Sequence, residues 1–441
     1  MSPHAIAPMP ALFAALAALL VCLAPVLRVA AYQAFPESDA NRTFDTTFSI
    51  SPPPGSVPPH LRGATFQLYN YITPDYDPSR VRRAVIALHG LGRDAWGYFD
   101  QTNEALHNAT SRRDRKSKRP RLARDEVVIM APLFMNDEDQ GGFPVDEQGN
   151  PTTSALVWPK NKWAEGADTI LPATIYDEDG DEVSAPGISS FEALDEVIRY
   201  FSNQSVFPRL NTIIIAGHSL GAQMVQRYAL IGSVPSGETP VHFVVANPGS
   251  FAYLSDWRPR NYAGCPETFN AWKFGLGSYG QRYLSDFISQ SLDTSNDIES
   301  VVARYRRRVV SYLFGLADDG LGDTGCEARA QGLNHLSRGR NFVKHLSGMD
   351  DGFPDTHSVE YIRGVAHDAL GMFTSRAGLE RLFYINLDGT ELPTAVGDDD
   401  RGINRWLFEQ MNSACGESTG TTTAILSSMM AAATAWWLVS T

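Results

Sequence analysis

Short apolar runs alternate with amphipathic segments along the body of the chain. Six runs are apolar almost throughout, which is typical of strands buried on both faces of a sheet. These runs are Arg83–His89, Glu126–Ala131, Asn211–Ala216, Val241–Ala246, Arg308–Leu313 and Val359–Val365. The amphipathic, helix-like segments between them include Phe191–Phe201, Gln223–Ile231 and Ile298–Arg307. This alternation predicts an α/β fold with a mostly parallel central sheet covered by helices on both faces.

Residues 1–31 have the pattern of a secretory signal peptide. Ala11–Val21 is an uninterrupted apolar run, too short for a comfortable membrane span, and small side chains follow at Val29 and Ala31. Signal peptidase requires small side chains at such positions, so we expect cleavage after Ala31. No lysine or arginine precedes the apolar run, and the alternative is an N-terminal anchor that is not cleaved.

Residues 412–441 have the pattern of a signal for a glycosylphosphatidylinositol (GPI) anchor. Small residues begin at Asn412, nine mostly polar residues (Cys415–Thr423) follow, and Ala424–Val439 forms a sixteen-residue apolar tail. A membrane-spanning helix would want about 20 apolar residues and flanking positive charges, and this segment has neither. We therefore expect attachment to the outer leaflet at Asn412, with Ser413 as the alternative, and a protein on the extracellular cell surface.

Between these two signals, residues 32–60 form a proline-rich lead-in and residues 61–411 the main domain. Residues 135–187 interrupt the alternation of strands and helices with a long acidic, glycine-rich segment, which we interpret as an insertion and a candidate lid. Its Trp158 and Trp163 either face a substrate or pack in the core. The basic run Arg112–Arg124 is either a solvated loop or a site for an anionic partner.

Composition and charge exclude several classes of protein. The 441 residues carry 37 Lys+Arg against 50 Asp+Glu, a formal charge of −13, so nucleic acid is not an expected partner. Four cysteines with no C-x-x-C pair argue against a zinc site. Three Asn-x-Ser/Thr triplets are candidate glycosylation sites on surface loops of a secreted protein. They begin at Asn41, Asn108 and Asn203.

The candidate chemistry centres on Gly217–Gly221, which has the pattern G-x-S-x-G with Ser219 in the middle. This pattern alone is weak, since a chain of this composition contains about 0.2 copies by chance. Here it directly follows a predicted strand and precedes a predicted helix. A sharp strand-to-helix turn exposes its serine, and the helix N-terminus favours negative charge developing there. An ordinary glycine turn is the alternative.

In these features the chain resembles the α/β-hydrolase superfamily, over roughly Leu61–Leu387. The resemblance implies that a backbone amide after the strand ending in His89-Gly90 helps to hold an oxyanion. Leu91 matches that position, and Leu220, the residue after the serine, matches the second donor. The same glycine-rich stretch also mimics a dinucleotide-binding fingerprint. No acidic residue ends a second strand about 20 positions on, which argues against that cofactor.

The resemblance also implies the order nucleophile, acid, histidine along the chain. The acid is expected three residues after the glycine that ends the Arg308–Leu313 strand, at Asp318. Adjacent Asp319 is the competitor and Asp323 a more distant one. Four histidines follow: His335, His345, His357 and His367. We select His367 because it comes two residues after the last predicted strand, whereas the other three fall in loop-like sequence.

These residues predict a serine hydrolase that cleaves carboxylic esters, of small molecules or attached to a polymer, through a Ser219–His367–Asp318 triad. The chemistry requires neither a metal nor an organic cofactor. A peptidase or acyltransferase with the same triad is the alternative within this fold, and a non-catalytic surface-binding module is the alternative outside it.

One disulfide bond is predicted, between Cys265 and Cys326. Both cysteines remain after removal of the signal peptide, both follow predicted strands, and the secretory compartment is oxidising. Cys326 lies eight residues after Asp318, so a bridge would steady the loop that carries the acid. Two free thiols are the alternative.

Overall fold

The computed structural model describes residues 35–386, apart from 53–57, 62, 112–120, 140–141, 143–153, 178, 235–238, 278–282 and 284–294. The predicted signal peptide, most of the basic run, part of the predicted insertion and the predicted anchor signal with Asn412 lie outside the described residues. In the described part of the chain, no helix is both long and apolar enough to cross a membrane.

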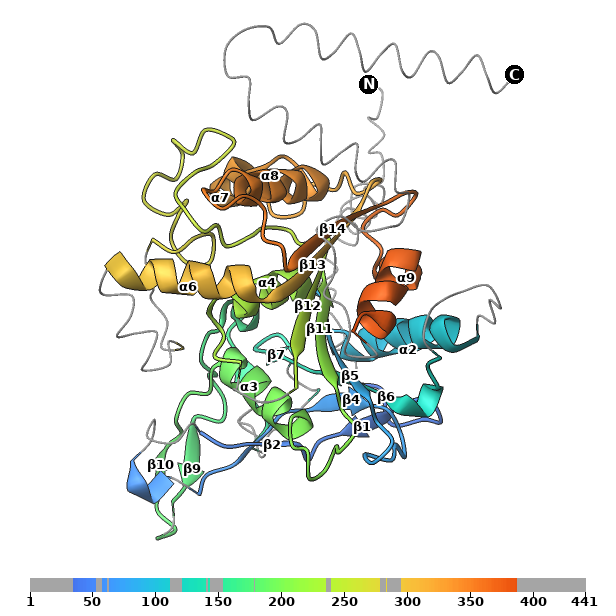
Figure 1. Ribbon diagram of the computed structural model, residues 1–441. Coiled ribbons are helices and arrows are strands. Elements are labelled where there is room, and N and C mark those ends of the chain that lie inside the picture. Colours follow the sequence, from blue (N-terminus) through green and yellow to red (C-terminus); the bar gives the residue numbers. More distant parts are fainter. Residues whose placement is uncertain are drawn as a thin grey trace, which may run out of the picture.

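Eight strands of the described chain form one central sheet (Figure 1). In spatial order they are β1 (Thr43–Asp45), β4 (Asn70–Ile72), β6 (Val127–Pro132), β5 (Arg83–Leu88), β11 (Thr212–His218), β12 (Val241–Ala246), β13 (Val309–Gly315) and β14 (His357–Ile362). The strands from β6 to β14 are parallel, whereas β4 and β1 add an antiparallel edge. The predicted mostly parallel sheet is confirmed, and all six predicted strands occur in it.

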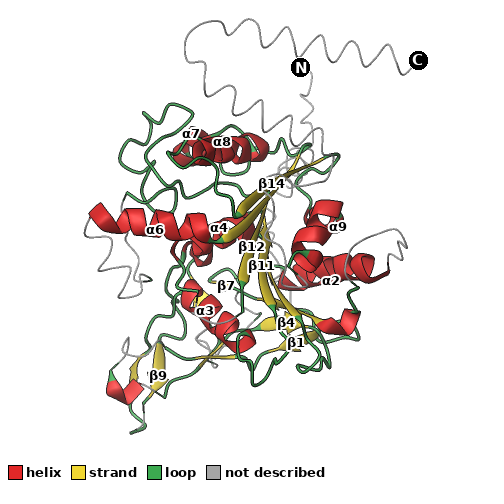
Figure 2. Ribbon diagram, viewed as in Figure 1, coloured by secondary structure: helices red, strands yellow, loops and turns green. Residues whose placement is uncertain are grey.

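Helices cover both faces of this sheet (Figure 2). They are α2 (Ala95–Ser111), α3 (Ser190–Phe201), α4 (Leu220–Ile231), α6 (Ser295–Arg307), α7 (Cys326–Gln331), α8 (His335–Ser347), α9 (Ala369–Thr374) and α10 (Arg376–Leu379). Helices α2 and α9 lie on one face, and α3, α4 and α6 lie on the other. The three predicted helices thus appear as α3, α4 and α6.

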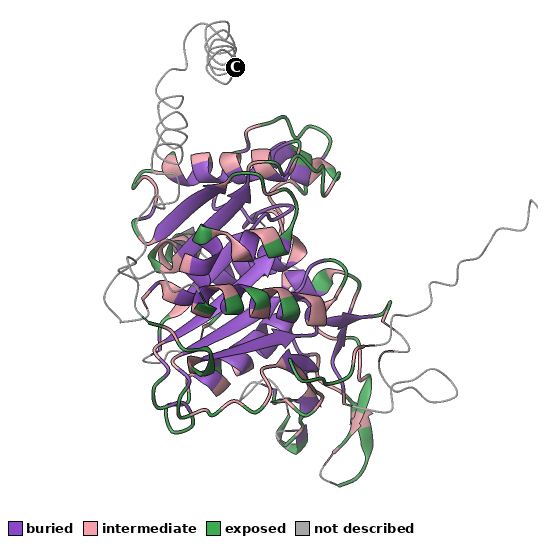
Figure 3. Ribbon diagram, turned by 90° about the vertical axis from the view of Figure 1, so that its right-hand side faces the viewer, coloured by how far each residue is buried: buried purple, intermediate pink, exposed green. Residues whose placement is uncertain are grey.

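The strand β11 shows why a continuous apolar run is required. Ile213 and Ile215 pack into the core on the side of α3 and α4, whereas Ile214 packs into the core on the side of α2. Because successive side chains of a strand point to opposite faces, both layers of helices need apolar partners from it. The central strands are accordingly buried along their whole length (Figure 3).

Part of the predicted lead-in belongs to the folded domain. The strand β1 pairs with β4, and β2 (Ser49–Ile50) pairs with β3 (Phe66–Gln67). The Asn70 side chain donates a hydrogen bond to the Asp45 carboxylate at 3.1 Å. The domain therefore begins before residue 61.

The described residues of the predicted insertion pack onto the domain through short strands. These are β7 (Met135–Asn136), β8 (Val157–Trp158), β9 (Thr174–Tyr176) and β10 (Glu182–Ser184). Trp158 and Trp163 are fully buried, and Trp163 stacks on Phe134 with ring centroids 5.8 Å apart. Of the two roles considered for these tryptophans, the structure shows packing in the core.

The end of the described chain is attached to the first residue of β5. The buried Arg83 guanidinium donates hydrogen bonds to the backbone carbonyls of Leu382, at 3.2 Å, and of Ile385. Burial lowers the pKa of Arg83 to about 9. These carbonyls supply the polar partners that a buried cation requires.

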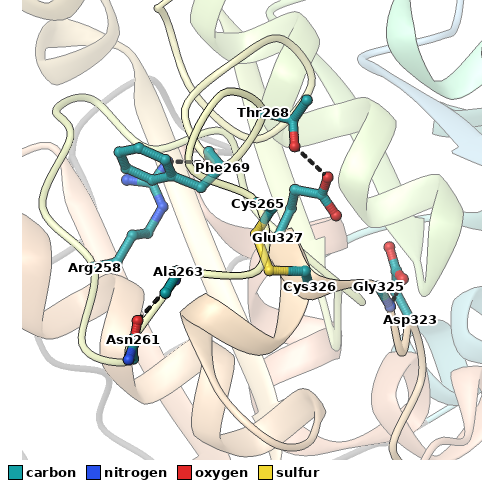
Figure 4. The surroundings of a disulfide bond; sticks show 10 residues. All are labelled: Arg258, Asn261, Ala263, Cys265, Thr268, Phe269, Asp323, Gly325, Cys326 and Glu327. Atoms are coloured by element: carbon teal, nitrogen blue, oxygen red, sulfur yellow. Dashed lines mark hydrogen bonds between the residues drawn. A yellow bond between two sulfur atoms is a disulfide. The ribbon is translucent and has the colours of Figure 1, made fainter.

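The predicted disulfide bond between Cys265 and Cys326 is present (Figure 4). Cys326 is the first residue of α7, and Cys265 lies in the long connection after β12. Beside the bridge, the Thr268 hydroxyl donates a hydrogen bond to the Glu327 carboxylate at 2.6 Å. The connection after β12 and the start of α7 are therefore joined by a covalent bond and by a hydrogen bond.

Candidate active site

Ser219 lies on a tight turn between β11 and α4. Its φ is 58°, a left-handed conformation that is uncommon for a residue with a side chain. The Ser219 N–H donates to the Ala246 carbonyl at 3.0 Å, while its hydroxyl has no hydrogen-bond partner among the described residues. The turn therefore exposes the hydroxyl, as a nucleophile requires.

The two glycines of G-x-S-x-G permit close approaches of backbone to backbone. A Cβ on Gly221 would lie 2.4 Å from the carbonyl oxygen of Leu88, at the end of β5. A Cβ on Gly217 would lie 2.4 Å from the carbonyl carbon of Gly221. Only glycine lets the start of α4 lie against the end of β5, which brings the serine turn next to the Gly90 turn.

Numbered by their order in the chain, the strands of the sheet lie in the spatial order 1-2-4-3-5-6-7-8. The strained serine turn follows the fifth of them. Together this strand order and this turn specify one fold. The chain has the α/β-hydrolase fold. The fold predicted from the resemblance is thus confirmed.

In this hydrolase fold, Asp318 and His367 meet at the carboxyl ends of β13 and β14. The His367 Nδ1 lies 2.8 Å from Asp318 Oδ2. Asn247 joins the two loops, because its side chain accepts from Gly315 N–H at 2.8 Å and donates to the Ala366 carbonyl at 3.0 Å. The neighbouring carboxylate, Asp319, is exposed. Asp318 rather than Asp319 is thus in position to orient His367.

A second histidine, His335, also contacts Asp318. Its Nδ1 lies 3.0 Å from Asp318 Oδ1, and its ring stacks on that of His367 with centroids 4.1 Å apart. Burial raises the pKa of Asp318, but the hydrogen bonds from both histidines outweigh burial and hold this pKa well below its ordinary value. Asp318 is therefore a carboxylate at neutral pH.

His367 also contacts His218, the residue before Ser219. The two ring centroids lie 4.4 Å apart, and the Tyr98 hydroxyl is 3.4 Å from His218 Nδ1. Burial lowers the pKa of His218 to about 3, so its ring is neutral. His367 is consequently in contact with two other imidazoles.

Of the two predicted oxyanion donors, Leu91 lines the same cavity as Ser219, and Leu220 is the residue that follows Ser219 in the chain. Among the described residues, neither the Leu91 nor the Leu220 amide donates a hydrogen bond, so both amides are free to bind a substrate oxygen. Arg93 fixes the first of these loops, because its side chain donates to the Leu91 carbonyl at 2.9 Å and to the Asp139 carboxylate at 2.6 Å.

His89 braces the Gly90 turn. The Phe134 N–H donates to its Nε2 at 3.0 Å, so its Nδ1 carries the proton and donates to the Gly90 carbonyl, also at 3.0 Å. Burial lowers the pKa of His89 to about 4, which keeps the ring neutral.

Ser219, His367 and Leu91 line one cavity of about 520 Å³. A volume of this order accommodates a small-molecule ligand. The described residues of the predicted insertion are absent from its lining. The other lining residues are Gly90, Gly92, Asp94, Tyr98, Gln101, His218, Asp368 and Ala369.

One group of acidic and histidine side chains in the described chain is close enough to bind a metal ion. Asp318, His335 and His367 place their potential ligand atoms within 4.8 Å of one another. Nδ1 of each histidine already takes part in a hydrogen bond with the Asp318 carboxylate. We therefore describe the group as a hydrogen-bonded cluster of one carboxylate and two imidazoles.

The candidate glycosylation sites differ in their surroundings. Asn41 and Asn203 are exposed in loops, as expected. Asn108 lies within α2, is half-buried, and donates to the Glu104 carboxylate at 3.3 Å. The expectation of a surface loop is thus wrong for Asn108.

Comparison with protein-family models and with curated proteins gave no match. Similar solved structures include a poly(aspartic acid) hydrolase from Sphingomonas sp. KT-1, at 18% identity and a TM-score of 0.45, covering 72% of this chain and 94% of that one. A poly(3-hydroxybutyrate) depolymerase from Bordetella parapertussis matches at 20% identity and a TM-score of 0.44, and the match covers 79% of this chain and 90% of that one. A siderophore hydrolase from Aspergillus nidulans matches at 13% identity and a TM-score of 0.37, and the match covers 82% of this chain and 100% of that one. Similarities this distant do not indicate the substrate. The fold is assigned from the strand order of the sheet and from the strained turn at Ser219.

Proposed function

We propose that the protein is a serine hydrolase that cleaves carboxylic esters through an acyl-enzyme intermediate. The observation that carries this proposal is the shared cavity of Ser219 and His367, with His367 hydrogen-bonded to the buried Asp318. Acyl transfer requires a serine nucleophile, a histidine that takes its proton and a carboxylate that orients the histidine.

The roles follow from the hydrogen bonds. Because Nδ1 of His367 donates to Asp318, its Nε2 is the nitrogen available to take the proton of the Ser219 hydroxyl. The serine oxygen then bonds to the ester carbonyl carbon, and the carbonyl oxygen becomes an oxyanion. The amides of Leu91 and Leu220 stabilise this charge, and each such donor typically contributes about 2.7–4 kcal/mol.

The remaining steps return the enzyme to its starting state. His367 gives its proton to the departing alkoxide, which leaves as an alcohol while the acyl group stays on Ser219. Water, deprotonated by His367, then attacks the carbonyl carbon of the acyl-enzyme. The bond to Ser219 breaks, a carboxylic acid leaves, and His367 returns the proton to the Ser219 oxygen. The ester is attached either to a small molecule or to a polymer whose end enters the cavity.

Labelling with a fluorophosphonate probe tests the proposed nucleophile. We expect one probe to attach to the folded protein at Ser219, and Ser219→Ala to abolish this labelling. Ser250→Ala, which removes a buried serine hydroxyl outside the cavity, is the matched control and should still be labelled. Intact folded protein that resists the probe as fully as Ser219→Ala would contradict the proposal.

We further propose that the mature protein is secreted and held on the cell surface by a GPI anchor at Asn412. The small triplet, polar spacer and apolar tail of residues 412–441 support the anchor, and a disulfide bond suits an oxidising compartment. Phosphatidylinositol-specific phospholipase C is expected to release the protein from intact cells. Protein that stays on the membrane and still contains Trp436 and Trp437 would disprove the anchor.

A further inference from the structure

Both oxygens of the Asp318 carboxylate are occupied by histidines. Oδ2 lies 2.8 Å from Nδ1 of His367, and Oδ1 lies 3.0 Å from Nδ1 of His335. A carboxylate held by one donor can still rotate about its terminal torsion, which has a broad energy minimum. A second donor on the other oxygen fixes the plane of the carboxylate. The direction in which Asp318 presents Oδ2 to His367 thus depends on His335.

We propose that His335 is a positioning residue of the catalytic set, which fixes the Asp318 carboxylate and the ring of His367 without touching the substrate. The proposal rests on the hydrolase function proposed above. His335 is buried and is absent from the lining of the cavity, whereas His367 reaches that lining. The parallel ring of His335, tilted by 12° at 4.1 Å, stacks on that of His367, and His218 also contacts His367.

The backbone around His335 would hold the helix in place without this side chain. The His335 N–H donates to the Gly320 carbonyl at 3.1 Å, and the Leu336 N–H donates to the Asp318 carbonyl at 3.3 Å. The Asn334 side chain caps α8 by accepting from the Ser337 N–H at 2.8 Å. Since the loop and helix are already joined by these bonds, the imidazole of His335 acts specifically on the carboxylate.

The loop after the acid is shaped around this imidazole. A Cβ on Gly320 would lie 3.3 Å from Nδ1 of His335, and a Cβ on Gly322 would lie 2.3 Å from its Nε2. Gly322 also has a φ of 56°, which disfavours other residues there. The chain therefore leaves room for the His335 ring beside the carboxylate that it contacts.

The experiment compares His335→Ala and His335→Asn in the full-length protein with an ester substrate. The alanine variant should lose about 10- to 100-fold in kcat, a loss typical of a misplaced catalytic group, with KM nearly unchanged. Asparagine can place an N–H close to the position of Nδ1, so it should recover most of that kcat.

A matched control is His345→Ala on the same helix. His345 is also a buried histidine, and its Nε2 accepts from the Leu254 N–H at 3.2 Å, away from the catalytic set. This variant should lower the unfolding temperature and leave kcat nearly unchanged. If His335→Ala does not fold, His335→Leu, which fills the same space without an N–H, replaces it in the comparison with His335→Asn.

Three results separate the two proposals. Wild-type kcat in both His335 variants would overturn the positioning role and leave the hydrolase function intact. Equal loss of kcat in both variants would overturn it too, because a purely structural role would not be rescued by the N–H of asparagine. A wild-type protein that hydrolyses no ester in a broad panel and takes up no fluorophosphonate would instead overturn the hydrolase function itself.

Discussion

Replacing Asp318 with asparagine is expected to lower kcat for ester hydrolysis by about 10⁴-fold, the loss typical of this change in a Ser-His-Asp triad. An amide has one oxygen to accept a hydrogen bond, whereas Asp318 accepts from both His335 and His367. The amide N–H₂ would face one imidazole as a donor and would favour its other tautomer. The transition state would also lose the negative charge that stabilises the His367 imidazolium. Steady-state kinetics with a soluble ester provides the measurement.

Asp319→Asn is the matched control, since it makes the same chemical change one residue away. Asp319 is exposed, and its backbone N–H contacts only the Ala317 carbonyl, at 3.1 Å. We expect its kcat to stay within about twofold of the wild-type value, as for most surface substitutions. A large loss in Asp319→Asn together with normal activity in Asp318→Asn would reverse the assignment of the acid.

Removing the disulfide bond with Cys265→Ser and Cys326→Ser together should lower the free energy of unfolding by about 4 kcal/mol. The bridge joins residues 61 positions apart, so it removes a large loop-closure entropy from the unfolded chain. Equilibrium unfolding in denaturant without reductant measures the difference. Reduced wild-type protein should match the double variant.

Thr268→Val is a control for the local contacts at the bridge. It removes the hydrogen bond from the Thr268 hydroxyl to Glu327 and leaves the covalent bond in place. Its expected cost is about 1 kcal/mol, the usual net value of such a bond. A double cysteine variant as stable as Thr268→Val would show that the cross-link contributes little.

The central sheet and the turn that carries Ser219 could be predicted because their signals are local. The Ile213–Ile215 run and the glycines around Ser219 lie within ten residues of one another, and each has a direct structural reason. The contact between Asp318 and His367 could be expected from their places after strands and from the residue order that the resemblance implies, because the carboxyl ends of parallel strands meet at one edge of the sheet.

The contact of His335 with Asp318 could not be predicted, because it arises only from the tertiary fold. The sequence around it was interpreted as a loop, whereas it is the first residue of α8, capped by Asn334. His345 lies on the same helix, and His357 begins β14, so neither of these lies in a loop either. An Asn-x-x-Ser capping pattern before an amphipathic stretch was the available signal for this helix.

The start of the folded domain within residues 32–60 could not be predicted, because the strands there are too short to form a recognisable hydrophobic pattern. The strand β1 has three residues, and its place is decided by pairing with β4 rather than by its own sequence. The places of Trp158 and Trp163 could not be predicted either, since a tryptophan in a long acidic segment suits a lid or a core. In the structure both rings pack against Phe134 in the core.

The attachment of Leu382 and Ile385 to Arg83 separates the end of the described chain from the candidate active site. Arg83 begins β5, whereas Ser219, Asp318 and His367 follow the carboxyl ends of their strands. A six-residue strand spans about 20 Å, so the described chain ends on the side of the sheet far from Ser219. Substitutions that loosen this end should therefore change the stability of the sheet before they change the geometry around Ser219.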